Sequence, residues 1–212
     1  MNPLMLLVLA VGAWFVFKGT AADNGASKDA PADANGMLAT VLAPSMTDTA
    51  QLTQFFQYFT AAYGNAATPQ AGLRLSLYAL VTALKVAMLQ KGSQPNPDEL
   101  LALAYAPASV INGIQQLPDA PADVQQATYA ALVDSQTDIG TIGSYIASLA
   151  AVAAQPGLST ARRKRLTAYM LAMKAKQMML QMNNSFKSPA YFAIANMTNV
   201  PTVAANSIFA YK

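Results

Sequence analysis

The chain has 212 residues, of which 54% are hydrophobic and only 11% charged, against about 25% charged residues in ordinary soluble domains. Cysteine and histidine are both absent, which excludes disulfides, thiol nucleophiles, Ser-His-Asp triads and the usual zinc ligands. Residues 1–138 hold all ten acids and five bases, whereas residues 139–212 hold eight bases and no acid. A surface with so few charges is expected to meet lipid or other protein, and the lopsided charge indicates a polyanionic partner or self-complementation.

The chain begins with "MNPLMLLVLAVGAWFVFK", which is uncharged from Pro3 to Phe17. A helix over residues 2–17 would be about 24 Å long, which is short of a hydrocarbon core of roughly 30 Å. Snorkelling by Lys18, which follows this helix, would close the gap. We therefore predict a single membrane-anchor helix over residues 1–18, with a cleaved signal peptide and a packed core helix as alternatives. The side chains expected to contact lipid are Leu4, Leu7, Val11, Trp14, Phe15, Phe17 and Lys18.

Residues 19–36 are small and polar, so we predict a flexible linker there. The pentapeptide "DAPAD" occurs at residues 29–33 and again at 119–123. Asp before Pro, with a second Asp in the first turn, is common at helix starts. We interpret the two copies as helix-start chemistry in an alanine-rich chain and not as an internal repeat.

From residue 37 to 188 the pattern is helical almost throughout, which predicts an all-α bundle of six or seven helices. Within the helix predicted over 69–90, Arg74 and Lys85 fall on one face and the other residues are apolar, which predicts a central helix with one exposed stripe. The helices expected in this domain cover residues 47–63, 69–90, a short stretch from 97, 107–116, 120–134 and 139–154.

The segment 139–154 carries no charge, and small residues recur along it every four positions. Such rows let helix backbones approach closely. A tightly packed core helix and a second membrane span are both compatible with this pattern.

A further helix is expected over residues 159–182, with Ser159 as its N-cap. Cations at a helix N-terminus oppose the helix dipole, and no acid follows residue 138, so we expect an anion from elsewhere. The acidic first half, another subunit and lipid phosphate are the candidates; nucleic acid is less favoured because no aromatic residues interleave with the cations. The candidate anion- or partner-binding residues are Arg162, Arg163, Lys164, Arg165, Lys174 and Lys176.

The same helix has two apolar faces, and residues 189–212 read as an extended apolar arm. Methionine is common at adaptable partner surfaces, and apolar arms often dock on a neighbour. The candidate partner-packing residues are Leu171, Met178, Met182, Tyr191, Phe192, Phe209 and Tyr211.

Two features could hide other chemistry. Glu99, the chain's single glutamate, would be the catalytic acid if the protein were a small peptidoglycan-cleaving enzyme. Asp134 and Asp138 lie one helical turn apart, but without a third ligand a solvated face is favoured over a metal site. We predict no catalytic residue, no cofactor and no metal.

The sequence therefore predicts a non-enzymatic, single-pass membrane protein whose main domain lies outside the bilayer and associates with other subunits. The specific expectation is a structural component of a virion, linking shell and membrane or forming part of a genome-delivery conduit. The alternatives are a partner-binding protein of a secretion or pilus machine in the bacterial inner membrane, and the muralytic enzyme.

Overall fold

A computed structural model describes residues 29–107, 112–115, 119–184 and 186–198. Within these ranges the chain is all-helical and has no strand, which confirms the predicted fold class. The predicted anchor, residues 19–28 of the predicted linker and residues 199–212 of the predicted arm lie outside the described residues. The helices are α2 (Ala32–Leu42), α3 (Thr49–Gly64), α4 (Pro69–Gln90), α5 (Pro97–Ala104), α6 (Ala122–Leu132), α7 (Ile139–Ala153), α8 (Thr160–Gln181) and α9 (Ser188–Ala195).

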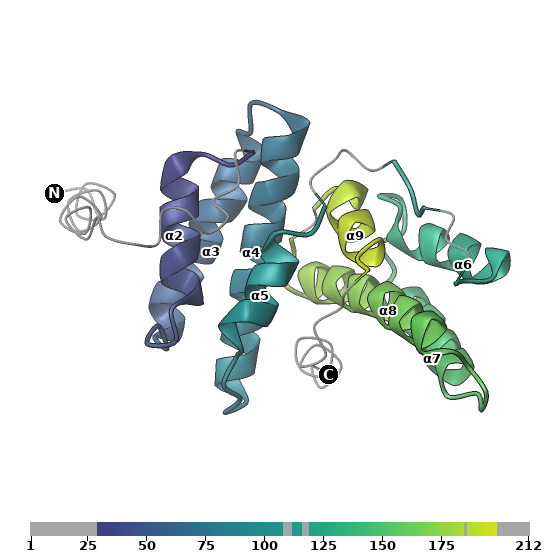
Figure 1. Cartoon of the computed structure of the whole chain (residues 1–212). Helices are drawn as coiled ribbons and strands as arrows, with labels where there is room; N and C mark the ends of the chain where they lie inside the picture. Colours follow the sequence, from purple (N-terminus) through teal and green to yellow (C-terminus); the bar gives the residue numbers. More distant parts are fainter. Residues whose placement is uncertain (1–28, 108–111, 116–118, 185, 199–212) are drawn as a thin grey trace, which may run out of the picture.

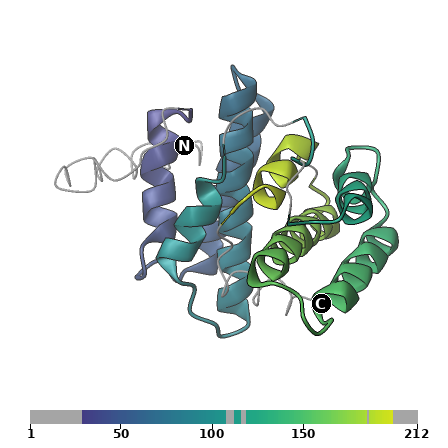
Figure 2. The same cartoon turned by 45° about the vertical axis from the view of Figure 1, so that its right-hand side comes forward.

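These helices form two halves with the same plan. Helices α2 to α5 have 11, 16, 22 and 8 residues, and helices α6 to α9 have 11, 15, 22 and 8. Equivalent positions are about 90 residues apart. The two halves lie side by side, with α2 at one end of the molecule and α6 and α7 at the other (Figures 1 and 2).

The interpretation of "DAPAD" as helix-start chemistry is confirmed, because both copies begin a helix with an aspartate in its first turn. The rejection of an internal repeat is wrong, because the two copies stand at equivalent places in two halves of the same plan. The proline of "DAPAD" is the N-cap of α2 at Pro31 and of α6 at Pro121. The halves also match at the end of their long helices, where Gly92 and Asn183 both have positive φ, 73° and 54°. Both positions require the left-handed conformation, which glycine adopts freely and asparagine tolerates.

Helix α4 is the centre of the first half. Thr68 caps its N-terminus by accepting from the Ala71 amide, and a proline occupies its first turn. It is long and apolar enough to cross a membrane, but 89% of its most apolar window is buried in the structure. Helices α2, α3 and α5 pack on it, and α9 of the second half contacts it as well. Contrary to the predicted exposed stripe, Arg74 and Lys85 are only 4% and 2% exposed.

Helix α8 has the same place in the second half, with α6, α7 and α9 around it. Ser159 accepts a hydrogen bond from the Arg162 amide at 3.2 Å, which confirms the predicted N-cap. Both predicted apolar faces of α8 are largely buried, because the other helices of its own half, α6, α7 and α9, pack around it.

Three predicted boundaries need correction. Helix α2 begins at Ala32, so the end of the predicted linker is already helical. Of the helix predicted over 107–116, the described residues 112–115 are not helical. The start of the predicted arm forms α9, all but one of whose residues are buried. An apolar segment of eight residues is equally compatible with an arm and a core helix, and burial decides between them.

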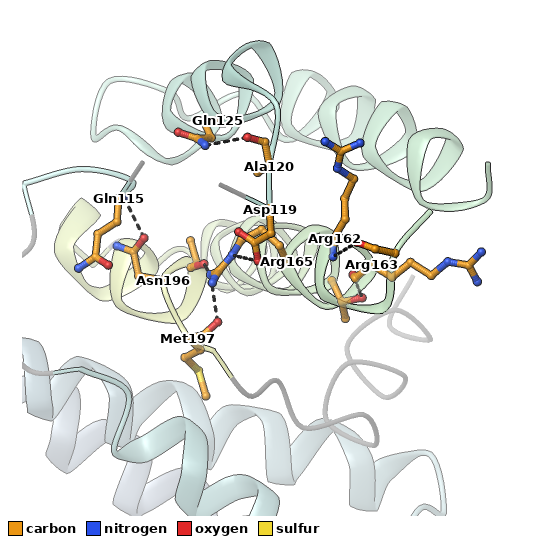
Figure 3. Close-up of polar contacts among 12 residues, drawn as sticks. Gln115, Asp119, Ala120, Gln125, Arg162, Arg163, Arg165, Asn196 and Met197 are labelled. Atoms are coloured by element: carbon orange, nitrogen blue, oxygen red, sulfur yellow. Dashed lines mark hydrogen bonds and ion pairs between the residues drawn. The ribbon is translucent and has the colours of Figure 1, made fainter. Parts of the chain in front are cut away.

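The halves meet through aromatic and polar contacts. The rings of Tyr63 and Phe186 meet edge to face at 5.1 Å, and the Lys187 amide donates to the Tyr63 hydroxyl at 3.1 Å. The connection between the halves is held by Asn196, whose side chain accepts from the Gln115 amide at 2.9 Å and donates to the Gly113 carbonyl at 3.2 Å (Figure 3).

Candidate interaction surface

Each half buries one arginine that caps the end of a short helix. In the first half, the Arg74 guanidinium donates to the carbonyls of Ala104 and Ala106, at and just after the end of α5. Its second amino group lies 3.6 Å from the carboxylate of Asp29. The last carbonyls of a helix lack partners within the helix and carry the negative end of its dipole. They therefore suit a buried cation.

The second half repeats this arrangement. Arg165 donates to the carbonyls of Ala195 and Met197, both at 3.0 Å, at the end of α9 (Figure 3). Its Nε lies 3.5 Å from a carboxylate oxygen of Asp119. Arg165 was predicted to bind a partner's anion. It is instead only 5% exposed and pairs with a carboxylate of its own chain.

Each half also buries one lysine, which caps the C-terminal end of the first helix of that half. Lys85 does this at the end of α2 and Lys176 at the end of α6. The Nζ–O distances are 2.6 Å to Val41 and 2.9 Å to Ala43 in the first half, and 3.1 Å to Ala131 and 2.7 Å to Val133 in the second. We call Arg74, Lys85, Arg165 and Lys176 the capping cations.

Burial shifts the protonation equilibrium of the two capping lysines. Desolvation lowers the pKa of Lys85 and lowers that of Lys176 to about 8, which the nearby Asp134 partly opposes. A neutral amine still has two N–H donors, enough for the two carbonyls that each lysine bonds. The capping cations therefore hold the fold together and are closed to solvent.

The other cations at the start of α8 are different. Arg163 and Lys164 are exposed and Arg162 is half-buried. Their side chains form no ion pair or hydrogen bond with the residues that the structure describes. In Figure 3 the Arg162 and Arg163 side chains point away from the Arg165–Asp119 pair and from each other. We call Arg162, Arg163 and Lys164 the basic corner.

The first half lacks this feature. The positions equivalent to the basic corner, just before Arg74 on α4, hold Ala71, Gly72 and Leu73. Because the first half forms the same helices with the same capping cations, the fold does not require the three exposed charges. They occur in the second half and not at the equivalent positions of the first.

Helix α7, which precedes the basic corner, also differs from its counterpart. Neither α7 nor α3 carries a charge, and α7 buries only Ile142 and Leu149, whereas α3 buries three side chains. Where α3 exposes Gln51, Gln54 and Gln57, the equivalent positions of α7 hold Thr141, Ser144 and Ala147. The segment 139–154 thus packs on α8 by one side and leaves a smooth, uncharged outer face.

Lys174, Asp134 and Asp138, by contrast, each have a local partner. Lys174 is half-buried and donates to Gln177 at 2.8 Å. Asp134 accepts from the amide and hydroxyl of Ser188 and lies 3.5 Å from Lys187. Desolvation raises the pKa of the Asp134 carboxyl, but these bonds and the lysine outweigh it and lower that pKa overall. Asp138 is the N-cap of α7.

Two open clefts lie on the described surface. An open cleft of about 510 Å³ lies between Tyr63, the start of α4 and Pro189, and its lining residues include no carboxylate. A second, of about 440 Å³, holds Asp134, which is already bonded to Ser188. Glu99 lines neither of them. No group of three metal-ligating side chains occurs among the described residues.

Most of the predicted partner-packing residues that the structure describes face the interior. Leu171, Met178, Tyr191 and Phe192 are at most 3% exposed, and their neighbours belong to the same bundle. Met182, at the C-cap of α8, is 37% exposed. Phe209 and Tyr211 lie outside the described residues.

Sequence reasoning missed the duplication, and with it the capping cations. The signal was present in two segments, "LRLSLYALVTALK" and "KRLTAYMLAMKAK", whose arginine, tyrosine and final lysine have identical spacing. Aligned with the two "DAPAD" copies, they would have identified the shared cations as structural. The comparison would also have isolated the basic corner as the part that is not shared.

No protein-family model matches the chain, and neither the curated proteins nor the solved structures include a match.

Proposed function

We propose that the protein is a non-enzymatic structural subunit of a larger assembly, held to a membrane by its N-terminal segment. The observation that carries this proposal is the basic corner: three cations that form no ion pair with the described residues, at positions where the first half carries no charge. Uncompensated surface charge of this kind is a feature of docking surfaces.

The difference between the outer surfaces of the two halves supports the same role. Neither α3 nor α7 carries a charge, but α3 exposes three glutamines, whereas the equivalent positions of α7 are small and lie next to the exposed cations of the second half. Such a tandem domain would present one surface to a partner and use the rest as a rigid spacer. A virion component that joins shell and membrane is our specific proposal within this class.

The experiment is the native mass of the full chain extracted in mild detergent from its source, by size exclusion with light scattering and identification of what co-elutes. A species of fixed stoichiometry, much heavier than one 22.3 kDa chain, is expected. A monomer without partners would contradict the proposal. Stoichiometric recovery in purified particles would support the virion role, and retention in cell membranes would favour an envelope machine.

A further inference from the structure

The basic corner spreads its charge over a wide angle. Successive residues of a helix point about 100° apart, so three consecutive cations cannot converge on one small ligand. Figure 3 shows this divergence for Arg162 and Arg163. A spread of positive charge is suited to an array of phosphates, each met by one side chain.

The surface around the corner places few negative charges against such an array. Helix α7 and the turn at residues 154–159 carry no charged side chain. Asp119 is paired with Arg165, and Asp138 caps the opposite end of α7. Because the exposed side chains of α7 are small, this face would insert little apolar surface into lipid. Contact would therefore be electrostatic and at the level of the headgroups.

The two ends of the domain differ in their relation to the N-terminus. Residues 1–28 precede Asp29 in the chain and therefore join the first half, whereas α6 and α7 lie at the other end of the molecule (Figures 1 and 2). A chain anchored in a bilayer through residues 1–18 keeps its domain at high local concentration near that bilayer. Even a weak contact at the far end would then hold the domain along the membrane instead of letting it swing.

We propose that the basic corner is a second membrane contact, in which Arg162, Arg163 and Lys164 bind lipid phosphates of an anionic bilayer. This inference rests on the proposed membrane anchoring. Nucleic acid fits less well, because three cations are few beside the 6–10 phosphate contacts of typical duplex binders. An acidic protein surface is also less favoured as the partner, because the apolar run at residues 3–17 independently indicates a nearby membrane.

The absence of cysteine makes the test direct, because one introduced cysteine is a unique labelling site. Gln155→Cys places a fluorophore on the exposed turn between α7 and α8, next to the basic corner. Asn65→Cys places it on the equivalent turn of the first half, between α3 and α4, and is the matched control. Each full-length variant is reconstituted into vesicles of phosphatidylcholine, with or without phosphatidylglycerol, that contain a headgroup-attached quencher.

We expect stronger quenching at Gln155→Cys in anionic than in neutral vesicles, and no such difference at Asn65→Cys. In the Gln155→Cys background, R162A/R163A/K164A should reduce quenching to the level seen in neutral vesicles, whereas the charge-conserving R162K/R163K/K164R should retain it. High salt should reverse it as well, since screening weakens contacts between exposed charges. Quenching at Gln155→Cys that ignores lipid charge, or that survives in the alanine variant, would overturn the inference. So would equal quenching at both turns.

Flotation separates this inference from the proposed function. If the anchor is real, the full chain floats with neutral vesicles whether or not the basic corner is present. If the wild-type chain fails to float with neutral vesicles, the anchoring is wrong. In that case the wild-type chain would still float with anionic vesicles if the basic corner binds lipid, and R162A/R163A/K164A would abolish this flotation. A wild-type chain that does not float with anionic vesicles would refute the basic corner as a lipid contact.

Discussion

The buried lysine of the second half predicts a specific dependence of stability on pH. In the folded protein burial lowers the pKa of Lys176 to about 8, against 10.5 as the ordinary value. Between these two values the unfolded chain binds more protons than the folded chain, so the free energy of unfolding rises with pH. One pKa unit corresponds to about 1.4 kcal/mol. The interval from pH 8 to pH 9.5 therefore gives a gain of about 2 kcal/mol.

Lys176→Met removes the titrating group and leaves the carbonyls of Ala131 and Val133 without their donor. Its unfolding free energy, from urea titration followed by circular dichroism in non-ionic detergent, should lack the rise. The difference between wild type and variant should thus grow by about 2 kcal/mol from pH 7 to pH 9.5. Lys187→Met, at an exposed lysine, is the control and should show no such growth. A difference that stays constant for Lys176→Met would refute the assignment of a desolvated capping amine.

The duplication allows further predictions on matched positions. Tyr78→Phe should cost about 1 kcal/mol, because it removes the hydrogen bond to Asn35 at 2.7 Å; Tyr169→Phe should be neutral or stabilising, because that hydroxyl is buried without a partner among the described residues, and chemical denaturation compares the two. Gly92→Ala should lower the unfolding free energy by about 1 kcal/mol, because φ is 73° at this residue and alanine is strained there. A thermal melt measures the change, and an unchanged melting temperature would show that the site is not strained. Arg165→Ala should cost about 3–5 kcal/mol, seen as a collapse of the unfolding midpoint; a loss under 1 kcal/mol would mean that the cap is dispensable.

Helix positions could be predicted from the sequence because their signals are local. The prolines at 69 and 97 and the cap at Ser159 mark helix starts that the structure reproduces. These signals depend on residues within one turn of the helix end, so one sequence suffices to read them.

The place of the cations could not be predicted in the same way. On α4, periodicity puts Arg74 and Lys85 on one face, and charge alone suggests that this face meets solvent. The carbonyls that bury these cations belong to α5 and α2, 30 and 44 positions distant in the chain. Only packing brings these helix ends together with these side chains, and no pattern within α4 alone indicates it; the one signal in the sequence is that the arginine and the lysine recur at the same spacing in α8. The exposed basic corner was predicted as a group with Arg165 for the same reason: the four residues are alike in sequence and differ in burial.

The most direct test of the division between capping cations and basic corner is the urea unfolding midpoint of full-length R162A/R163A/K164A beside that of Arg165→Ala. We predict that the triple variant unfolds within about 0.5 kcal/mol of wild type, although it loses three charges, and that the single variant is strongly destabilised. A triple variant as unstable as Arg165→Ala would contradict the account, because it would make the exposed cations part of the fold.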